Sequence, residues 1–419
     1  MMTISPKSAP WICCQLGARE HYAIPRALQQ HGHLACLITD AWVNSNATLR
    51  LSIPPLNHLR ERFHADLASA SVRAFTRSLI RFELGQRLQT ISGWEQIINR
   101  NLWFQTQALL ALEALSPERS TLFTLDCRPT LFAYSYAALE LLCYAKRKGW
   151  RTILGQIDPG PLEEERVLKE HARCSIYRSS WRPAPSHYWE CWQEECATAD
   201  WIVVNSDWSS QALQHVGIPG KKIKIIPLAY TPPSQANDFM RVYPPFFSVQ
   251  RPLRVLFLGQ VILRKGIACL LEAAEILQDR AVEFWIVGSQ GISKVQPAVG
   301  QFQIKWIGSV PRSATARYYQ QADVFLFPTL SDGFGLTQLE AQAWKLPIIA
   351  SRFCGSVVKD RVNGLVLEEV SGDAIASTLK FCLNHPQQLQ FFSQRATHPS
   401  QFNLSNLENN LHNLPHVTV

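Results

Sequence analysis

The densest group of residues that could do chemistry lies at 329–341, which reads T-L-S-D-G-F-G-L-T-Q-L-E-A. An apolar run ends at Phe327 just before it, and the two glycines predict a tight turn that opens a helix. Backbone N–H groups at such a turn face outward, where the helix dipole favours an anion. Asp332 precedes the turn and Glu340 follows eight residues later, so both carboxylates can face one cleft. The alternative is structural, with Asp332 as an N-cap and Glu340 on the helix surface.

A second candidate is the loop at 259–266, G-Q-V-I-L-R-K-G, which follows a predicted strand at 254–258. Such a loop lies at the carboxyl edge of a parallel sheet, where ligands of open α/β folds bind. Arg264 and Lys265 would then face the same crevice as the glycine turn, although an exposed basic loop is the alternative. Cations, amides and carboxylates together suit a nucleotide-diphosphate sugar, because the cations and amides neutralise a diphosphate leaving group.

Short apolar runs alternate with amphipathic segments along most of the chain, which predicts βαβ units and parallel sheets with helices on both faces. In the first half we expect strands at 11–16, 34–39, 122–125, 152–154 and 201–204, and helices at 23–30 and 131–148. In the second half we expect strands at 254–258, 283–287, 304–306, 324–327 and 346–350, and helices at 312–321, after Gly335 and at 372–383. The predicted fold is α/β, with two doubly wound, Rossmann-like domains and a cleft between them.

Six prolines at 226–252 interrupt the alternation. We therefore expect domains at 1–232 and 253–395, a linker at 233–252, and a tail at 396–419 that packs back on the body. Residues 56–115 predict two or three helices inserted in the first domain. Their arginines favour a solvated helix face, and an interfacial helix that meets anionic lipid or a charged acceptor is the alternative. These arginines are Arg60, Arg62, Arg73, Arg77, Arg81 and Arg87.

Composition excludes several classes of protein. The 419 residues fit two domains, 47% apolar and 18% charged residues exclude a disordered chain, and a net charge of +8 is too mild for a dedicated nucleic-acid binder. Eleven cysteines without a C-x-x-C pair predict free thiols, and no apolar run fits a signal peptide or a membrane span. We expect a cytoplasmic protein, with weak peripheral contact to the inner face of a membrane as the alternative. Twelve histidines without metal-ligand spacing predict no metal, and no other cofactor motif is present.

Three segments of the second half carry a resemblance to a known family: G-Q-V-I-L-R-K-G at 259–266, W-I-G-S-V-P at 306–311 with A-D-V-F-L-F-P-T at 322–329, and S-D-G-F-G-L-T-Q-L-E-A-Q-A-W-K-L-P-I-I-A-S at 331–351. In order and spacing they resemble the donor domain of retaining glycosyltransferases of family 4 (glycosyl transferases group 1), which have the GT-B fold. G-S-V-V-K-D-R-V-N-G-L-V at 355–366 matches less tightly. In the first half the similarity is looser and includes G-A-R-E at 17–20.

The resemblance implies a role for each matching residue. Lys265, with Arg264 beside it, would bind the donor diphosphate, Glu340 would accept hydrogen bonds from the ribose, and Asp332 would lie near the donor sugar. Asp332, Glu340 and Lys265 are therefore the expected catalytic residues. The expected donor site also includes Gly17 against the phosphate, Val310 beside the base, and the backbone amides of Gly333, Phe334, Gly335 and Leu336.

The resemblance also implies the reaction, in which a sugar passes with retention and without a metal from a nucleotide-diphosphate sugar to an acceptor hydroxyl. The acceptor would be a saccharide, lipid or small molecule on the N-terminal domain, and the reaction would belong to carbohydrate biosynthesis. A sugar-nucleotide epimerase of the same fold and a non-catalytic nucleotide-sugar-binding protein are the alternatives.

Some positions depart from the family pattern. Asp332 is one methylene shorter than the usual Glu, and Lys345 replaces a frequent Gly. Gln260 replaces the usual Arg, so Arg264 is a candidate substitute. The first domain lacks a frequent His, and Asp158 in I-D-P-G-P is the candidate on the acceptor side. An Asx residue that starts a turn is the alternative for Asp158.

Overall fold

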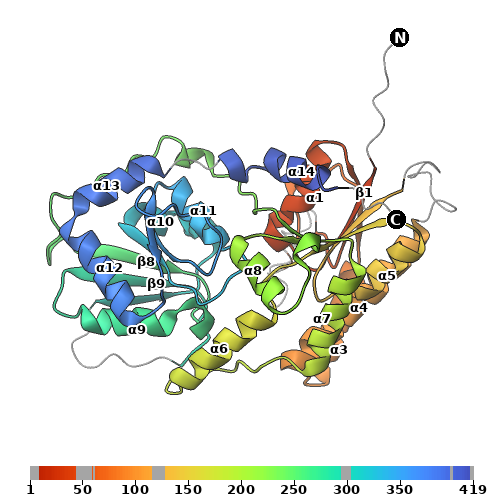
Figure 1. The fold of residues 1–419 in the computed structure, drawn as a ribbon, viewed down its shortest axis with the longest axis horizontal. Coiled ribbons are helices and arrows are strands. Elements are labelled where there is room, and N and C mark those ends of the chain that lie inside the picture. Colours follow the sequence, from red (N-terminus) through yellow and green to blue (C-terminus); the bar gives the residue numbers. More distant parts are fainter. Residues whose placement is uncertain are drawn as a thin grey trace, which may run out of the picture.

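The computed structural model describes residues 9–43, 59, 62–115, 128–293, 303–396 and 400–415, and within them the chain forms two β-sheets (Figure 1). The strand order is β3-β2-β1-β4-β5-β6-β7 in the first sheet and β10-β9-β8-β11-β12-β13 in the second. All strand pairs in both sheets are parallel. Each order reverses beside the first strand of its sheet, as in a doubly wound fold. The predicted α/β class with two Rossmann-like domains is confirmed.

The strands of the first sheet are β1 (Trp11–Gln15), β2 (Leu34–Thr39), β3 (Val72–Ala74), β4 (Thr130–Tyr134), β5 (Arg151–Gly155), β6 (Trp201–Val204) and β7 (Ile223–Ile225). Those of the second are β8 (Leu253–Leu258), β9 (Val282–Val287), β10 (Ile304–Gly308), β11 (Val324–Phe327), β12 (Ile348–Ser351) and β13 (Gly364–Leu367).

The α-helices that precede the second sheet are α1 (Ala23–Gln30), α3 (Thr76–Leu88), α4 (Gly93–Ala114), α5 (Leu139–Arg147), α6 (Pro161–Arg173), α7 (Ser186–Thr198) and α8 (Asp207–His215). Later in the chain come α9 (Ile267–Ile276), α10 (Ala316–Gln321), α11 (Leu336–Ala343), α12 (Gly372–Asn384), α13 (Pro386–Arg395) and α14 (Leu404–His412).

Some predicted elements of the first domain were wrong. The predicted helix at 131–148 is two elements, the strand β4 and the helix α5. Because β4 is buried along its whole length between β1 and β5, its residues do not alternate in polarity, and its apolar run merged with that of α5. The three-residue strand β3 pairs with β2 inside a segment that was expected to hold only helices. The predicted strand at 122–125 lies outside the described residues.

Two segments pack across the molecule. Cys174 and Tyr177, which follow α6, are buried in the hydrophobic core of the second sheet. Arg173 at the end of α6 forms an ion pair with Glu272 of α9 at 2.5 Å. Near the C-terminus, α14 lies beside α1 (Figure 1), and its leucines are buried in the core of the first sheet. Contacts between segments that are distant in the sequence therefore hold the two sheets and their helices together.

Candidate functional site

Two loops of the second sheet meet at the carboxyl ends of β8 and β11. Gly266 has φ +75°, and a Cβ at this position would lie 1.9 Å from the carbonyl oxygen of Pro328. Leu330 donates its backbone N–H to the carbonyl oxygen of Arg264 at 2.8 Å. Only a glycine at 266 lets the basic loop pack this closely against the segment before the glycine turn. The two loops predicted to bind a ligand therefore form one site.

Lys265 and Asp332 form an ion pair in this site. Asp332 also accepts a hydrogen bond from the backbone N–H of Phe334 at 3.3 Å, and a guanidinium nitrogen of Arg264 lies 4.0 Å from its carboxylate. Burial opposes the charged form of Asp332, but Lys265 and Arg264 outweigh it and lower the pKa of the carboxyl. Asp332 is therefore an ionised partner of Lys265, and any anion that binds Lys265 competes with it.

The glycine turn also touches the first domain. A Cβ at Gly333 would lie 2.4 Å from the carbonyl oxygen of Ile157, in the loop after β5. The hydroxyl of Ser206, the N-cap residue of α8, donates to the carbonyl oxygen of Gly333 at 2.7 Å. The turn that opens α11 at Leu336 is thus fixed between the domains, and it requires a glycine at 333 because the backbones approach so closely.

The other residues of the turn shape its backbone. Phe334 is buried against Phe402 of the C-terminal tail, with ring centroids 5.7 Å apart. Gly335 has φ +84°, and a Cβ there would lie 2.5 Å from the ring of Phe327. Because the Phe334 ring packs in a hydrophobic cluster, the turn can offer a ligand backbone groups but not this side chain.

Glu163, in the first turn of α6, belongs to the same site and was missed in the sequence. One of its oxygens lies 3.4 Å from Nε of Arg264, and the other is buried without a hydrogen-bond partner in the protein. Arg264 also donates to the carbonyl oxygen of Ser331 at 3.0 Å. Burial raises the pKa of Glu163 to about 7; Arg264 opposes this, and Asp158 and Asp332 add to it. In the sequence it is indistinguishable from the ordinary acidic residues of a first helical turn.

Asp158 has the geometry of an Asx turn, because its Oδ1 accepts a hydrogen bond from the backbone N–H of Gly160 at 2.9 Å. The same oxygen accepts a hydrogen bond from the hydroxyl of Tyr136 at 2.5 Å. With Tyr136, Tyr188 and Arg19, Asp158 lines a cavity of about 120 Å³ in the first domain. The contact with Gly160 is that of an Asx residue that starts a turn. The role of Asp158 toward an acceptor stays a prediction.

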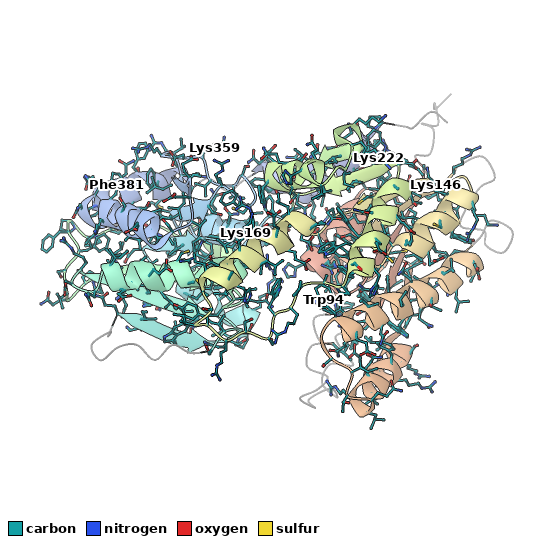
Figure 2. The ribbon with its side chains drawn as sticks, turned by 60° about the horizontal axis from the view of Figure 1, so that its bottom comes forward. Trp94, Lys146, Lys169, Lys222, Lys359 and Phe381 are labelled. Atoms are coloured by element: carbon teal, nitrogen blue, oxygen red, sulfur yellow. The ribbon has the colours of Figure 1, made fainter. Side chains whose placement is uncertain are left out.

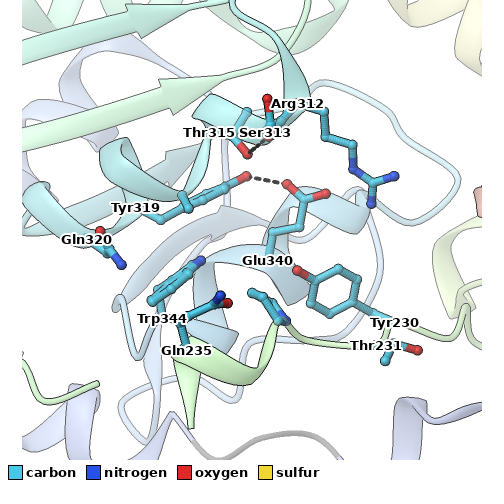
Figure 3. Close-up of a pocket in the computed structure, with 12 residues that line it drawn as sticks. Tyr230, Thr231, Gln235, Arg312, Ser313, Thr315, Tyr319, Gln320, Glu340 and Trp344 are labelled. Carbon is cyan, nitrogen blue, oxygen red and sulfur yellow. Dashed lines mark hydrogen bonds between the residues drawn. The ribbon is translucent and has the colours of Figure 1, made fainter. Parts of the chain in front are cut away.

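Glu340 lines a cavity of about 590 Å³ in the second domain (Figure 3). It accepts a hydrogen bond from the hydroxyl of Tyr319 at 2.8 Å, and Arg312 extends past its other side. Burial raises the pKa of Glu340, while Tyr319 and Arg312 oppose this shift. Tyr230 and Trp344 add aromatic walls. Such a cavity suits a nucleoside, because aromatic rings pack against a base and a carboxylate accepts hydrogen bonds from ribose hydroxyls.

A second cavity, of about 600 Å³, lies against the first domain and shares Tyr230, Thr231 and Arg312 with the first. Arg312 of the second domain places a guanidinium nitrogen 2.5 Å from Nδ1 of His21 in the first. Burial, helped by Arg312, lowers the pKa of His21 to about 4, so its ring is neutral at pH 7. Val310, expected beside the base, is half-buried two residues before Arg312 and packs against the core of the second domain.

Gly17 lies at the start of the loop that follows β1. Its φ is +86°, its N–H donates to Asp40 at 3.1 Å, and a Cβ there would lie 2.6 Å from the guanidinium of Arg62. The group that lies closest to Gly17 is therefore a side chain of the first domain. The contact between Gly17 and a phosphate stays a prediction.

The same loop continues in a strained turn. Glu20, His21 and Tyr22 have φ of 51°, 54° and 60°, and three consecutive left-handed residues other than glycine are costly. All three line the second cavity. Burial raises the pKa of Glu20 to about 7, even though Tyr134 donates a hydrogen bond to it at 3.0 Å. Residue types alone give no signal for this turn, because none of the three favours a positive φ.

Comparison with known proteins finds relatives for part of the sequence. Residues 252–385, which include Lys265, Asp332 and Glu340, match the family model described as "Glycosyl transferases group 1". The amylovoran biosynthesis glycosyltransferase AmsK of Erwinia amylovora is 27% identical over 39% of this chain and 42% of its own length. The D-inositol 3-phosphate glycosyltransferase of Thermobifida fusca is 26% identical over 46% of this chain and 49% of its own length. The chain thus spans about half the length of these curated relatives.

Solved structures resemble the whole chain. Anabaena HepE in complex with UDP and glucose has a TM-score of 0.58 at 12% identity and covers 96% of this chain and 98% of its own. Sucrose-phosphate synthase from Thermosynechococcus elongatus has a TM-score of 0.60 at 17% identity and covers 96% and 97%. At such identities the likeness shows the fold alone, and that fold is GT-B.

Proposed function

We propose that this protein is a retaining glycosyltransferase of family 4, which transfers a sugar from a nucleotide-diphosphate sugar to a hydroxyl of a saccharide, lipid or small-molecule acceptor. One observation carries the proposal. Lys265 and Asp332, which form an ion pair, and Glu340, which lines the 590 Å³ cavity, all belong to the segment that matches the group 1 family model. Asp332 and Glu340 belong to a single strand–turn–helix unit, and Lys265 reaches it from the neighbouring loop.

The proposed donor lies along this unit. The nucleoside occupies the 590 Å³ cavity, where Glu340 accepts hydrogen bonds from the ribose. The diphosphate lies toward Lys265 and the amides of the glycine turn, and it displaces Asp332 from Lys265 because both anions need the same ammonium group. Asp332, once displaced, is free to accept a hydrogen bond from a hydroxyl of the donor sugar.

The proposed reaction breaks the bond between the anomeric carbon and the diphosphate oxygen and forms a bond from that carbon to the acceptor oxygen on the same face. The acceptor proton passes to the departing diphosphate. Lys265, Arg264 and backbone N–H groups stabilise the charge that develops on the leaving group, so no metal is needed for that task. Asp158 and the 120 Å³ cavity beside it are the candidates for the acceptor side.

The test is a thermal-shift screen of purified protein with UDP, GDP, ADP and their hexose conjugates, followed by assays of nucleotide release with and without EDTA. A ligand at one hundred times its Kd stabilises a protein by about 2.7 kcal/mol, so a true donor raises the Tm measurably. Release of nucleoside diphosphate together with a glycosylated product reports transfer. A product with the same anomeric configuration as the donor indicates retention, and the opposite configuration indicates inversion. Conversion of the sugar without release indicates an epimerase, and binding without turnover indicates a non-catalytic protein.

We also propose a cytoplasmic location. The ten described cysteines are free, and eight of them are buried, as in proteins of reducing compartments. Among the described residues, no helix combines the length and the apolar character that crossing a membrane requires. Fractionation of cells that express the protein, with and without a salt wash of the membranes, tests both the location and any peripheral attachment.

A further inference from the structure

Three side chains with metal-ligating atoms meet where the tail packs on the first domain. His33 lies in the turn between α1 and β2, while Glu408 and His412 lie four residues apart on α14. One ligand atom from each lies within 4.8 Å of the others. Residues four apart on a helix share a face, so Glu408 and His412 both point toward the same neighbour. None of the three lines either large cavity of the cleft.

The backbone around these side chains is firmly held. His33 donates its N–H to the carbonyl oxygen of Leu28 at 2.9 Å, and its own carbonyl accepts from the N–H of Trp11 at 2.9 Å. Leu407 and Leu411 of α14 are buried in the core of the first sheet. Two ligands on a packed helix and one on a fixed turn give the rigid support that a metal site needs.

The ligand atoms of the group already lie close to one another. The side chain of Glu408 is only 4% exposed, and its Oε1 lies 2.7 Å from Nδ1 of His33. Both atoms are buried, and within the described residues they contact each other without making a hydrogen bond. A shared cation would give the carboxylate oxygen and the ring nitrogen a common partner in place of this contact. The ring of His412 stacks on that of His33, with centroids 5.1 Å apart, and completes the group from the exposed side.

We propose that His33, Glu408 and His412 bind one Zn²⁺ ion, with water as the fourth ligand, and so clamp α14 to the first domain. Imidazole nitrogens and a carboxylate oxygen are ordinary zinc ligands at about 2.0–2.2 Å, which places tetrahedral ligand atoms roughly 3.3 Å apart. The site forms when Glu408 and His33 separate slightly and the exposed His412 ring turns inward. This inference departs from the expectation of no metal, which rested on the lack of metal-ligand spacing among the histidines. The sequence could not show this group, because Glu408 follows His33 by 375 residues. It does not depend on the proposed function.

The test uses the full chain without an affinity tag, stripped with a chelator and titrated with ZnCl₂ in a calorimeter, with MgCl₂ as the comparison. We expect one equivalent of zinc to bind and no binding of magnesium at the same concentrations. His412→Ala, at an exposed position that does not threaten the fold, lowers zinc affinity at least about tenfold, because it removes one of three ligands. The matched control is His31→Ala, since His31 is an exposed histidine of the same turn as His33 but outside the group.

A second variant and a background substitution distinguish this site from zinc binding elsewhere on the chain. Glu408→Gln keeps the side-chain shape and also weakens zinc binding, while its Tm without metal shows that it folds. Repeating the titrations in Cys191→Ser excludes binding by that exposed thiol. The proposal is overturned if no zinc binds, or if His412→Ala and His31→Ala bind it equally well. Either result would leave His33 and Glu408 as a simple ion pair.

Discussion

The guanidinium of Arg264, on the second domain, lies 3.4 Å from the carboxylate of Glu163, on the first. Arg264 also contacts Ser331 and lies near Asp332, so it connects α6 to the glycine turn. Because its charge is shared between two carboxylates, Arg264 is less available to a diphosphate than an arginine without such partners would be. Glu163 in turn is buried, and burial disfavours its charged form and raises its pKa. The stability of the folded protein therefore depends on pH.

We predict that Glu163→Gln stabilises the protein more at pH 8 than at pH 5. The pKa of Glu163 is raised from 4.5 to about 7, so between these values the folded protein binds a proton that the unfolded chain lacks. Raising the pH through this window therefore removes stability from the natural protein, whereas the glutamine does not titrate. The difference in unfolding free energy should grow by at least about 1.4 kcal/mol, the value of one pKa unit.

Urea unfolding at several pH values measures this difference. Glu165→Gln is the matched control, since Glu165 is exposed in the same helix and its pKa is lowered, so it should show no change between pH 5 and 8. A difference between Glu163→Gln and the natural protein that stays constant with pH would contradict the assignment of a raised pKa.

A second prediction concerns the two cations. Lys265→Ala should lower kcat/KM for the donor by at least about tenfold, because a charge-assisted hydrogen bond is worth roughly 1.5–3 kcal/mol. Arg264→Ala should also lower turnover, and the double variant should lose less than the sum, since groups that act on one phosphate are not independent. Lys169→Ala, at an exposed lysine of α6, is the control. If Arg264→Ala is silent while Lys265→Ala is severe, Arg264 only connects the domains.

The alternation of short apolar runs with amphipathic segments was sufficient to predict two parallel sheets. A buried strand reads as a short apolar run, whereas the apolar residues of a helix recur at helical spacing. The boundary between β4 and α5 was lost, since Thr130–Tyr134 is buried on both faces and carries no alternation. The strand β3 is three residues long, too short for a pattern, and it exists because β2 offers it an edge. Tertiary pairing, not local sequence, determines such elements.

The meeting of Lys265 and Asp332 could be predicted because their loops are continuous in the sequence and glycines mark the turns. The roles of Lys265, Asp332 and Glu340 toward a donor stay predictions. Glu163 and Glu20 could not, because each acts through neighbours that are distant along the chain, such as Arg264 and Tyr134. Their burial also follows from how the two domains pack, which local residue types do not encode.

The third prediction concerns Glu340. Glu340→Gln keeps the shape of the side chain but loses charge-assisted hydrogen bonds to the ribose, so transfer should fall at least about tenfold while the Tm changes little. Initial rates at saturating acceptor measure it, and Glu275→Gln on the exposed side of α9 serves as the control. An unchanged rate would return Glu340 to a structural role as the hydrogen-bond partner of Tyr319.

The inserted helices α3 and α4 lie in the segment for which contact with anionic lipid was the alternative interpretation. Arg77 and Arg81 are exposed on α3, and Leu84 and Leu88 on the same helix are 54% and 86% exposed. Their spacing of four, three and four residues places them along one face. Trp94, labelled in Figure 2, anchors the start of α4 by donating to the carbonyl oxygen of Arg182 at 2.9 Å. An arginine face with two exposed leucines fits an interfacial helix as well as a solvated face, and vesicle binding distinguishes the two.

On the interfacial interpretation, we expect the protein to sediment with vesicles that contain phosphatidylglycerol at low salt and to leave them as ionic strength rises, because salt screens surface charges. The double variant Arg77→Ala/Arg81→Ala should weaken binding at low salt, and Leu88→Ser should weaken it at every salt concentration, since it removes buried apolar area rather than charge. Arg147→Ala, at an exposed arginine on α5, should bind like the natural protein. Failure to sediment with acidic vesicles even at low salt would show that the arginines of α3 form a solvated face.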